Sequence, residues 1–428
     1  MGKKDVKLLI ILAIIIAVFC FIRLIPRAVS ADSVRISQNG EVIGIYSLFK
    51  NTTIDLAHNR ITIQNGKVYM EDADCPDKSC INQGAITHTG ETIACLPNRV
   101  IVEIIGKKII SGTKPVNYSG IHFDTLVNVT VYNVPDGLNV SEYIGKECEK
   151  YELICSRTLE NSELYGLNNR SLISDKTVDY NGRNIKAYKV SDELYTMISK
   201  GKEAYEESDG RFDIAIARLT SLWDFKSGNA VIPDKAEIEN ALPCLSANDI
   251  ILCDDGYIAF TNDETMIDLG GLAKGYIADS LKTSLISKGV KSAVISLGGN
   301  VALIGDKSGK PFNVGVRKPF SNASAPALTI EAGNVSVVTS GTYERYFIKD
   351  DKLYHHILNP NTGFPYETDL SGVTIICDSS IDGDILSTTL LSLGSKEATA
   401  KAQELKNEGI YVILMDEKGN VLYNSYNG

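Results

Sequence analysis

The first third of the chain alternates apolar and polar positions in short runs separated by turn residues. Val34-Arg-Ile and Val42-Ile-Gly-Ile-Tyr follow a two-residue period, which is typical of a strand with one buried face. The pairs Asn39-Gly40 and Asn65-Gly66 lie between such runs, and Asn-Gly is a strong hairpin signal because both residues accept a positive φ. The pattern predicts a small antiparallel β domain over residues 33–112.

Beyond Pro115 the apolar pattern changes to alternating helix and strand periods. Residues 141–156 place an apolar stripe on one helical face, and Ser191 is a favourable N-cap for a second helix. Further helices are expected at residues 236–242 and 272–285, and strands at 122–132, 250–252, 257–260, 266–269 and 293–297. The sequence therefore predicts a mixed α/β (α+β) domain preceded by a small all-β domain.

The N-terminus combines a basic tip with an apolar segment. Three lysines lie within the first seven residues, and residues 8–22 are all apolar. That length is long for a signal peptide and just short of the ~20 residues that span a bilayer comfortably. Arg23 and Arg27 precede the small residues that could form a cleavage site, so an uncleaved transmembrane anchor is favoured over a cleaved signal peptide. Either alternative predicts that the remainder lies outside the cytoplasm.

The length of the chain indicates how many domains it contains, and its net charge indicates which classes of partner it can bind. A chain of 428 residues exceeds one ordinary core. We predict a cytoplasmic tip and transmembrane anchor at residues 1–31, the β domain at 32–113 and the larger domain at 114–428. The formal net charge of −10 argues against nucleic acid as a partner, since phosphate contacts need a basic surface. Proteins and small molecules are the expected partners.

Three cysteines lie close together in the predicted β domain. They belong to Cys75-Pro-Asp-Lys-Ser-Cys80 and Cys95-Leu-Pro-Asn98. A structural zinc site needs four ligands, and only His88 is nearby as a fourth. A disulfide with one cysteine left over is the better expectation outside the cytoplasm, and the sequence leaves its pairing among the three open.

Two glycine pairs follow predicted strands in the larger domain. Gly270 and Gly271 precede a helix whose start carries Lys274, a combination that suits an anion because helix N-termini offer unpaired N–H groups. Leu297-Gly-Gly-Asn300 repeats the strand and the glycine pair, with Asn300 as a side-chain hydrogen bonder. Either turn alone is commonly just a tight turn, but two of them could flank one dinucleotide.

Two further segments carry hard ligands and a possible base. With a helix starting near Asp384, Ser387 and Thr388 lie three and four residues on and place their hydroxyls over the carboxylate, a combination that suits Mg2+. Asp384 could equally be a plain N-cap residue. His355 and His356 are adjacent at the end of a predicted strand and face opposite ways, so at most one faces a site where it could accept a proton.

Taken in order, these segments resemble the FAD:protein FMN transferase (ApbE) family from about Ile121 to the C-terminus. The resemblance rests on Ser162-Glu-Leu, Leu167-Asn168, Asp209-Gly-Arg-Phe-Asp213, Leu222-Trp-Asp-Phe225, Asp268-Leu-Gly-Gly-Leu-Ala-Lys-Gly275, Leu297-Gly-Gly-Asn300, Ser340-Gly-Thr-Tyr-Glu-Arg345, His356-Ile-Leu-Asn-Pro360 and the run from Asp384 to Thr388. The cysteine-containing segment, with Gln83-Gly84, resembles the NusG domain-II-like module.

The resemblance implies a flavinyltransferase that moves FMN from FAD to a Ser or Thr hydroxyl of another protein and releases AMP. It implies Mg2+ held by Asp384, Thr388 and the Ala273 carbonyl, and His356 as general base in preference to His355. Flavin-nucleotide positions would be Ser162, Asn168, Asp213, Gly270, Gly271, Lys274, Asn300, Glu344 and Arg345.

The acceptor implied by the family is a subunit of a membrane flavin redox complex. Two positions depart from the family's pattern: Ile214-Ala215 replaces the usual Pro-Thr, and Asn359 stands where aspartate is commoner. The alternatives left by the sequence are an FAD pyrophosphatase that uses water as acceptor, a non-catalytic flavin-binding or storage protein, and an adhesion or scaffold protein. The last would not explain the ordered motifs.

Overall fold

The structure is a computed structural model that describes residues 31–76, 78–106, 115–225, 231–321 and 326–426. The predicted anchor at the N-terminus falls outside these ranges. Within them, no helix has the length and apolar character needed to cross a bilayer.

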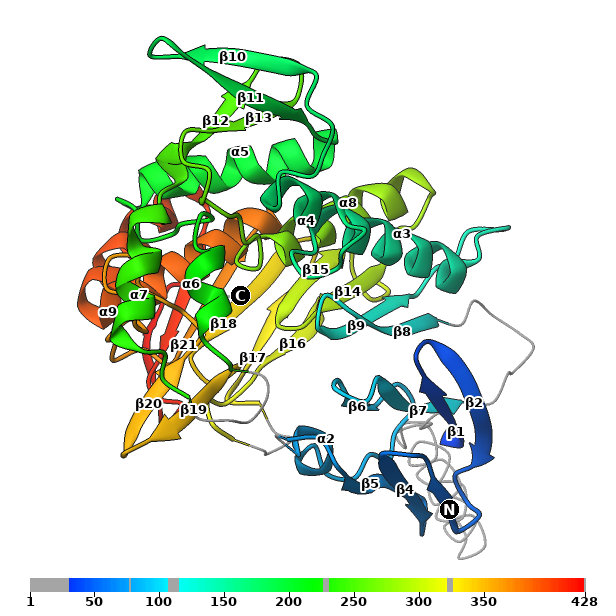
Figure 1. The fold of residues 1–428 in the computed structure, drawn as a ribbon. Coiled ribbons are helices and arrows are strands. Elements are labelled where there is room, and N and C mark those ends of the chain that lie inside the picture. Colours follow the sequence, from blue (N-terminus) through cyan, green and yellow to red (C-terminus); the bar gives the residue numbers. More distant parts are fainter. Residues whose placement is uncertain (1–30, 77, 107–114, 226–230, 322–325, 427–428) are drawn as a thin grey trace, which may run out of the picture.

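The N-terminal β domain consists of two antiparallel sheets around one apolar core (Figure 1). The four-stranded sheet has the order β2-β1-β7-β6 and the three-stranded sheet the order β3-β4-β5. The elements are β1 (Ala31–Gln38), β2 (Glu41–Ser47), β3 (Thr52–Asp55), β4 (Asn59–Gln64), β5 (Lys67–Ala73), the short helix α2 (Ser79–Asn82), β6 (Thr92–Cys95) and β7 (Val100–Gly106).

Both predicted Asn-Gly hairpins are confirmed. Asn39 and Gly40 connect β1 to β2 with φ of 53° and 83°, and Asn65 and Gly66 connect β4 to β5 with φ of 53° and 73°. Positive φ at both central residues is the geometry that a tight hairpin turn requires. The local turn chemistry therefore sets the register of this domain.

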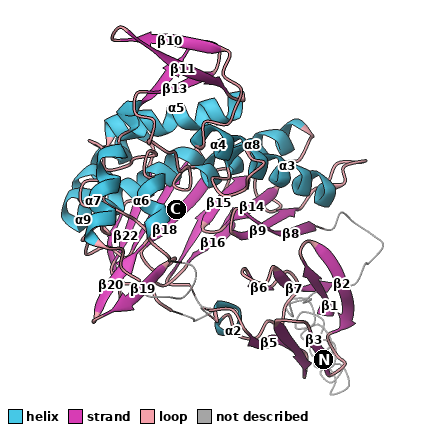
Figure 2. Ribbon diagram, viewed as in Figure 1, coloured by secondary structure: helices cyan, strands magenta, loops and turns pink. Residues whose placement is uncertain are grey.

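The larger domain is built on one antiparallel sheet of eight strands with the order β23-β22-β21-β18-β15-β14-β9-β8. Its strands are β8 (Val116–His122), β9 (Thr125–Val131), β14 (Ala293–Leu297), β15 (Asn300–Ile304), β18 (Ser336–Gly341), β21 (Gly372–Cys377), β22 (Tyr411–Met415) and β23 (Val421–Asn424). Helices α3 (Val140–Cys155), α8 (Ala273–Ser287) and α9 (Ser380–Leu405) cover one face (Figure 2).

The remaining elements surround this sheet. The ribbon β16 (Phe312–Val316) and β17 (Leu328–Ala332) shares an apolar cluster with it, while β10-β11-β13-β12 form a separate four-stranded sheet. The other bounds are α4 (Glu163–Asn168), β10 (Lys176–Tyr180), β11 (Arg183–Lys189), α5 (Asp192–Glu207), α6 (Ala217–Leu222), α7 (Lys235–Ala241), β12 (Ile250–Cys253), β13 (Tyr257–Phe260), β19 (Tyr346–Lys349) and β20 (Lys352–His355).

The central strands are buried on both faces, as their sequences require. In β22, Val412 and Leu414 pack beneath α9, whereas Ile413 and Met415 pack with the β16–β17 ribbon. Side chains alternate along a strand, so an unbroken apolar run serves two cores at once. The strand pair β21–β22 is therefore the middle layer of the domain.

Two predicted strands differ from the structure. The one predicted at 122–132 forms as β9 but begins only at Thr125, because Phe123 and Asp124 adopt positive φ of 54° and 56° and turn the chain from β8 into β9. The one predicted at 266–269 is wrong: Met266 makes only an isolated bridge to Ile216. The backbone of residues 266–269 forms its hydrogen bonds with the Asn168 side chain and with the Ile214 carbonyl instead of with a neighbouring strand.

Helices α8 and α9 pack closely at Gly275. A Cβ built on Gly275 would lie 2.5 Å from Ile381 Cα and would overlap the Ser380 carbonyl. These are backbone atoms, which cannot rotate away as a side chain can. Glycine is therefore required for the two helices to approach at this point.

We predict that Gly275→Ala lowers the free energy of unfolding by about 3 kcal/mol, because overpacking at a backbone contact forces the two helices apart. The matched control is Gly145→Ala in α3, where the added Cβ meets only the Tyr118 side chain at 3.6 Å or more. That variant should gain about 1 kcal/mol from helix propensity. Denaturant unfolding measures both, and equal stability of the two variants would contradict the close approach.

Candidate functional site

The first glycine turn is shaped by Asp268. One of its carboxylate oxygens accepts the Gly270 N–H at 2.8 Å. The other lies 2.9 Å from Arg157 Nε and accepts the Thr220 hydroxyl at 2.9 Å. The turn leads directly into α8, where the Lys274 ammonium lies 3.4 Å from the Gly270 carbonyl. A cation is thus placed at the start of a helix, beside the glycine turn.

The second glycine turn joins β14 to β15. Gly298 and Gly299 have φ of 51° and 95°, and Leu297 pairs with Asn300 across the turn. Asn300 is fully buried, and its amide oxygen accepts the Ser380 hydroxyl at 2.6 Å. Its amide nitrogen makes no hydrogen bond of full geometry among the described residues, but it interacts with the Asp384 carboxylate and lowers the pKa of Asp384. Asn300 therefore fixes the second turn to the beginning of α9 through its amide oxygen. Its amide nitrogen can still donate to a ligand.

The beginning of α9 is held by two other polar residues. Ser379 caps the helix by accepting the Asp382 N–H at 3.3 Å. Asp279 of α8 accepts the N–H groups of Ser380 and Ile381 at 2.8–3.0 Å. Asp384 is therefore not the N-cap that the sequence left as an alternative, since it lies a turn further on.

Asp384 is the buried carboxylate of the site. It is 3% exposed, and its Oδ2 accepts the Gly275 N–H at 2.7 Å and lies 3.9 Å from the Lys274 ammonium. Burial raises the pKa of Asp384, and the nearby Lys274 charge, the Gly275 N–H and the Asn300 side chain oppose that rise. These three contacts favour the ionised form that a metal ion needs.

A group of hydroxyls lies beside this carboxylate. Thr388 follows Asp384 by one helical turn, and its Oγ1 lies 3.3 Å from Ser340 Oγ. Ser340 Oγ also lies 2.8 Å from Ser387 Oγ. The strand β18 thus supplies a third hydroxyl to the two on α9. Together with the carboxylate they form a set of hard oxygen donors, the type that Mg2+ prefers.

The two histidines are distinguished by their hydrogen bonds. His355 is buried; its Nδ1 accepts the Ile357 N–H at 3.3 Å, so its Nε2 donates to the Tyr366 carbonyl at 3.1 Å. His356 Nδ1 lies 3.3 Å from the Arg345 carbonyl, which can only accept. His356 Nε2 is therefore left as the acceptor, and His356 is the better candidate base.

Burial and nearby positive charges keep His356 neutral. Burial lowers its pKa most, and Arg345, His355 and Lys274 add to the effect, so that the pKa is about 3. Burial likewise lowers the pKa of His355 to about 4. At neutral pH the His356 imidazole is in the form that can accept a proton.

Electrostatic proximity shows that these groups share one site. Glu344 interacts with Lys274, Arg345 and Asp384, and it is exposed to solvent. The Glu344 carboxylate also lies 3.3 Å from the position of a Cβ on Gly299. The structure thus brings together both glycine turns, Lys274, Asn300, Glu344, Arg345, His356, Asp384 and Thr388.

Three other predicted site residues use their side chains to form hydrogen bonds with the protein backbone. Ser162 caps α4 by accepting the Tyr165 N–H at 3.2 Å and donates to the Ser156 carbonyl. Asn168 accepts the Ile267 N–H at 2.7 Å and donates to the Ile267 carbonyl at 2.8 Å. These two bonds take the place of a strand partner, which explains why the predicted strand at 266–269 does not form.

Asp213 is the third of these residues. Its Oδ1 accepts the Ala215 N–H at 2.7 Å, whereas its buried Oδ2 has no hydrogen-bond partner in the described parts of the chain. Burial raises the pKa of Asp213 to about 6. The positive charge closest to Asp213 belongs to Lys202, so its surroundings differ from those of the Lys274 and Asp384 pair.

Sequence reasoning missed several residues that complete the site. Asp279 is one helical turn after Gly275 on α8, and that spacing could have marked it as facing α9. Ser387 is predicted beside Thr388 over the carboxylate, whereas Ser340, inside another quoted motif, is a hydroxyl that the sequence pattern does not connect with them. Trp223, whose indole donates to the Gly363 carbonyl at 3.0 Å, stacks with Phe225 and Tyr354 two residues before His356.

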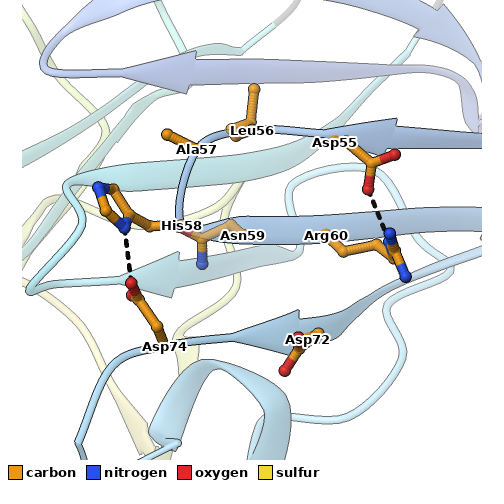
Figure 3. Close-up of a pocket in the computed structure, with 8 residues that line it drawn as sticks. All are labelled: Asp55, Leu56, Ala57, His58, Asn59, Arg60, Asp72 and Asp74. Atoms are coloured by element: carbon orange, nitrogen blue, oxygen red, sulfur yellow. Dashed lines mark hydrogen bonds and ion pairs between the residues drawn. The ribbon is translucent and has the colours of Figure 1, made fainter.

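A shallow hollow on the β domain holds none of the predicted site residues (Figure 3). Its charged side chains are already paired: His58 Nδ1 lies 2.6 Å from Asp74, and Arg60 Nε lies 2.6 Å from Asp55. The chemistry predicted from the sequence therefore gathers in the larger domain.

The fold and the site define a class of protein. It is an α+β enzyme domain in which two glycine turns hold a lysine, a buried carboxylate and a histidine around a place for an anionic ligand. The chain belongs to the ApbE family, whose model matches residues 123–414. NusG domain II matches residues 8–108.

Similar proteins agree with this assignment. An FAD:protein FMN transferase of Klebsiella pneumoniae (strain 342) is 36% identical over 237 residues, 55% of this chain and 73% of the relative. The FAD:protein FMN transferase of Treponema pallidum (strain Nichols) is 29% identical over 312 residues, 69% of this chain and 83% of the relative. The crystal structure of the ApbE protein of Thermotoga maritima superposes with a TM-score of 0.63 and 28% identity, covering 73% of this chain and 97% of the other.

We predict that Asn168→Ala lowers the free energy of unfolding by about 3 kcal/mol, because both polar groups of the Ile267 backbone lose their buried partner. The neighbouring Asn169→Ala is the control, since Asn169 is exposed and makes one bond, to the Tyr165 carbonyl. Thermal unfolding without any flavin measures both changes. If Asn168→Ala unfolds like the parent protein and only loses flavin affinity, Asn168 is a ligand contact.

Proposed function

We propose that this chain is a Mg2+-dependent FAD:protein FMN transferase that modifies a Ser or Thr of a protein outside the cytoplasm and releases AMP. The observation that carries the proposal is the convergence of Lys274, Asn300, Asp384 and His356 between the two glycine turns. Membership of the ApbE family and the printed function of its relatives support it.

The residues present fit a bound Mg2+. Asp384 and Thr388, one helical turn apart, offer a carboxylate and a hydroxyl, and the Ala273 carbonyl at the start of α8 is the third proposed ligand. The buried Asn300 amide nitrogen interacts with the Asp384 carboxylate without forming a hydrogen bond of full geometry, so a polar ligand at this position can satisfy it. Bound Mg2+ would neutralise charge on the pyrophosphate and polarise the phosphorus for attack.

The side chains of the chain itself supply the rest of the proposed reaction. Lys274 offsets the negative charge of the pyrophosphate, and the glycine turns leave space for its approach. His356 Nε2 takes the proton of the acceptor hydroxyl as that oxygen bonds to the FMN phosphorus. The bond between this phosphorus and the AMP oxygen breaks, and AMP leaves with the bonding electrons.

The test is covalent labelling of a candidate acceptor. The full-length chain in detergent is incubated with FAD, Mg2+ and the acceptor, and a fluorescent flavin band that survives denaturation is measured. We expect His356→Ala to slow labelling by about 10²–10⁴-fold, the usual contribution of a general base. Asp384→Ala should slow it at least as much because the metal loses its buried ligand.

The controls are Asp382→Ala, an acidic residue near the start of the same helix, and His88→Ala, an exposed histidine of the β domain. Both should label at the parent rate. Free FMN and AMP without a labelled protein would identify a pyrophosphatase instead. FAD retained without turnover would identify a flavin-binding or storage protein.

We further propose that the apolar segment at residues 8–22 anchors the chain in the membrane with its catalytic part outside the cytoplasm, near an acceptor subunit of a membrane flavin redox complex. The basic tip and the apolar run support this placement. Protease added to intact cells should degrade the catalytic domain and spare a cytoplasmic marker. A chain that is cut only after lysis lies on the other side.

A further inference from the structure

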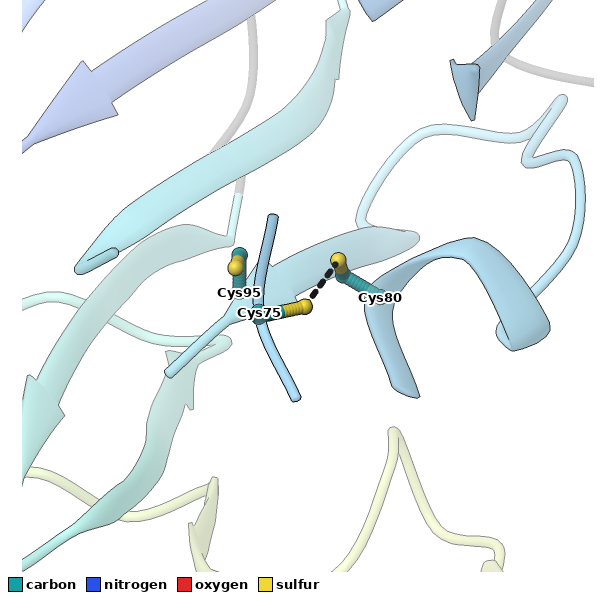
Figure 4. A group of neighbouring side chains, drawn as sticks. All are labelled: Cys75, Cys80 and Cys95. Carbon is teal, nitrogen blue, oxygen red and sulfur yellow. Dashed lines mark hydrogen bonds between the residues drawn. The ribbon is translucent and has the colours of Figure 1, made fainter. Parts of the chain in front are cut away.

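Three cysteine sulfurs meet in the core of the β domain. Cys75 follows β5, Cys80 lies on α2 and Cys95 ends β6, and the three are at most 1% exposed. Their sulfur atoms lie within 4.8 Å of one another, and those of Cys75 and Cys80 are 3.4 Å apart (Figure 4). The sequence predicts a disulfide between two of these cysteines, but the structure brings all three sulfurs together without a disulfide among them.

The segments that carry the sulfurs are fixed by dedicated polar contacts. Gln83, just after α2, donates to the Ala94 carbonyl and accepts the Ala94 N–H, both at 3.0 Å. These two hydrogen bonds hold the segment that carries Cys80 against the strand that ends at Cys95. Asn98 donates to the His58 carbonyl at 3.1 Å and to the Asp74 carboxylate at 3.0 Å, which ties the turn after Cys95 to the segment of Cys75.

The sulfur spacing distinguishes two uses of these thiols. A disulfide needs its sulfurs at ~2.05 Å. A metal ion with three coplanar sulfurs at ~2.3 Å sets the sulfurs about 4 Å apart. The observed separations, from 3.4 Å to at most 4.8 Å, bracket the metal geometry. A disulfide would also use only two of the three sulfurs, whereas a metal ion can bind all of them.

The donor set indicates which metal fits. Across the described ranges, no histidine, carboxylate or further cysteine joins the three sulfurs within that distance. The fourth zinc ligand considered from the sequence, His88, is 76% exposed and lies against Thr87 and Glu91. Thiolates select soft ions, and monovalent copper is stable with three sulfur ligands, whereas structural zinc takes four.

We propose that Cys75, Cys80 and Cys95 form a three-thiolate site for one monovalent copper ion in the β domain. Lys78, between Cys75 and Cys80, donates to the Ala73 carbonyl and so ties the loop that carries both sulfurs back to β5. The copper ion stabilises the domain by linking β5, α2 and β6. The site is separate from the flavin site and does not depend on the proposed transfer.

The test is a titration of the reduced, full-length chain with Cu+ in the absence of oxygen, against a coloured chelator of Cu+. We expect one tightly bound copper per chain, lost in Cys95→Ser and in Cys80→Ser. Cys253→Ala, a buried cysteine at the end of β12, is the control and should retain the copper. Circular dichroism verifies that each variant is folded.

A second measurement does not depend on the variants. Cu+ should raise the unfolding temperature of the β domain within the full-length parent chain, because the three sulfurs converge only in the folded state and the ion therefore binds that state more tightly. Equal copper binding by the parent and Cys95→Ser would overturn the proposal. So would a Cys75–Cys80 disulfide found by peptide mapping in protein isolated without reductant, or preferential binding of zinc.

Discussion

The site depends on the hydrogen bond from the Gly275 N–H to the Asp384 carboxylate across the contact between α8 and α9. A carboxylate with 3% exposure is stable only if its charge is compensated. The helix start at Gly275 provides that compensation together with Lys274. The same contact requires glycine, because the α9 backbone occupies the space of a Cβ. One residue thus sets both the helix spacing and the carboxylate's position.

The second glycine turn is attached to the same point. Asn300 accepts the Ser380 hydroxyl, and Asp279 accepts the Ser380 and Ile381 N–H groups. The first turn of α9 therefore joins β15 and α8, the elements that begin at the two turns. A ligand between the turns meets groups whose positions are fixed before it binds, which reduces the cost of ordering them. The acidic chain attracts an anion here through local charge.

The sequence predicted the local elements of the fold better than their long-range arrangement. The Asn-Gly hairpins, the two glycine turns and the helices of the larger domain follow from local chemistry, and these elements formed. The strand at 266–269 did not, because Asn168 satisfies the Ile267 backbone from a helix 99 positions away. No local pattern reveals such a contact. The order of the eight-stranded sheet depends on equally distant pairings, for example β14 with β9.

Asn359 shows why a departure from a family's pattern has to be judged in three dimensions. Beside the proposed base, the loss of an aspartate suggested a differently tuned histidine. In the structure, the Asn359 side-chain oxygen accepts the Asn361 N–H at 2.9 Å and its carbonyl accepts the Gly363 N–H at 2.8 Å, so this residue builds the turn after His356. An asparagine oxygen makes that turn as well as a carboxylate does. The charges that act on His356 come from Arg345 and Lys274, and the Arg345 carbonyl sets its tautomer. The proposed base is therefore oriented by the backbone of one motif. It is kept neutral mainly by its burial, and the cations of two motifs add to this effect.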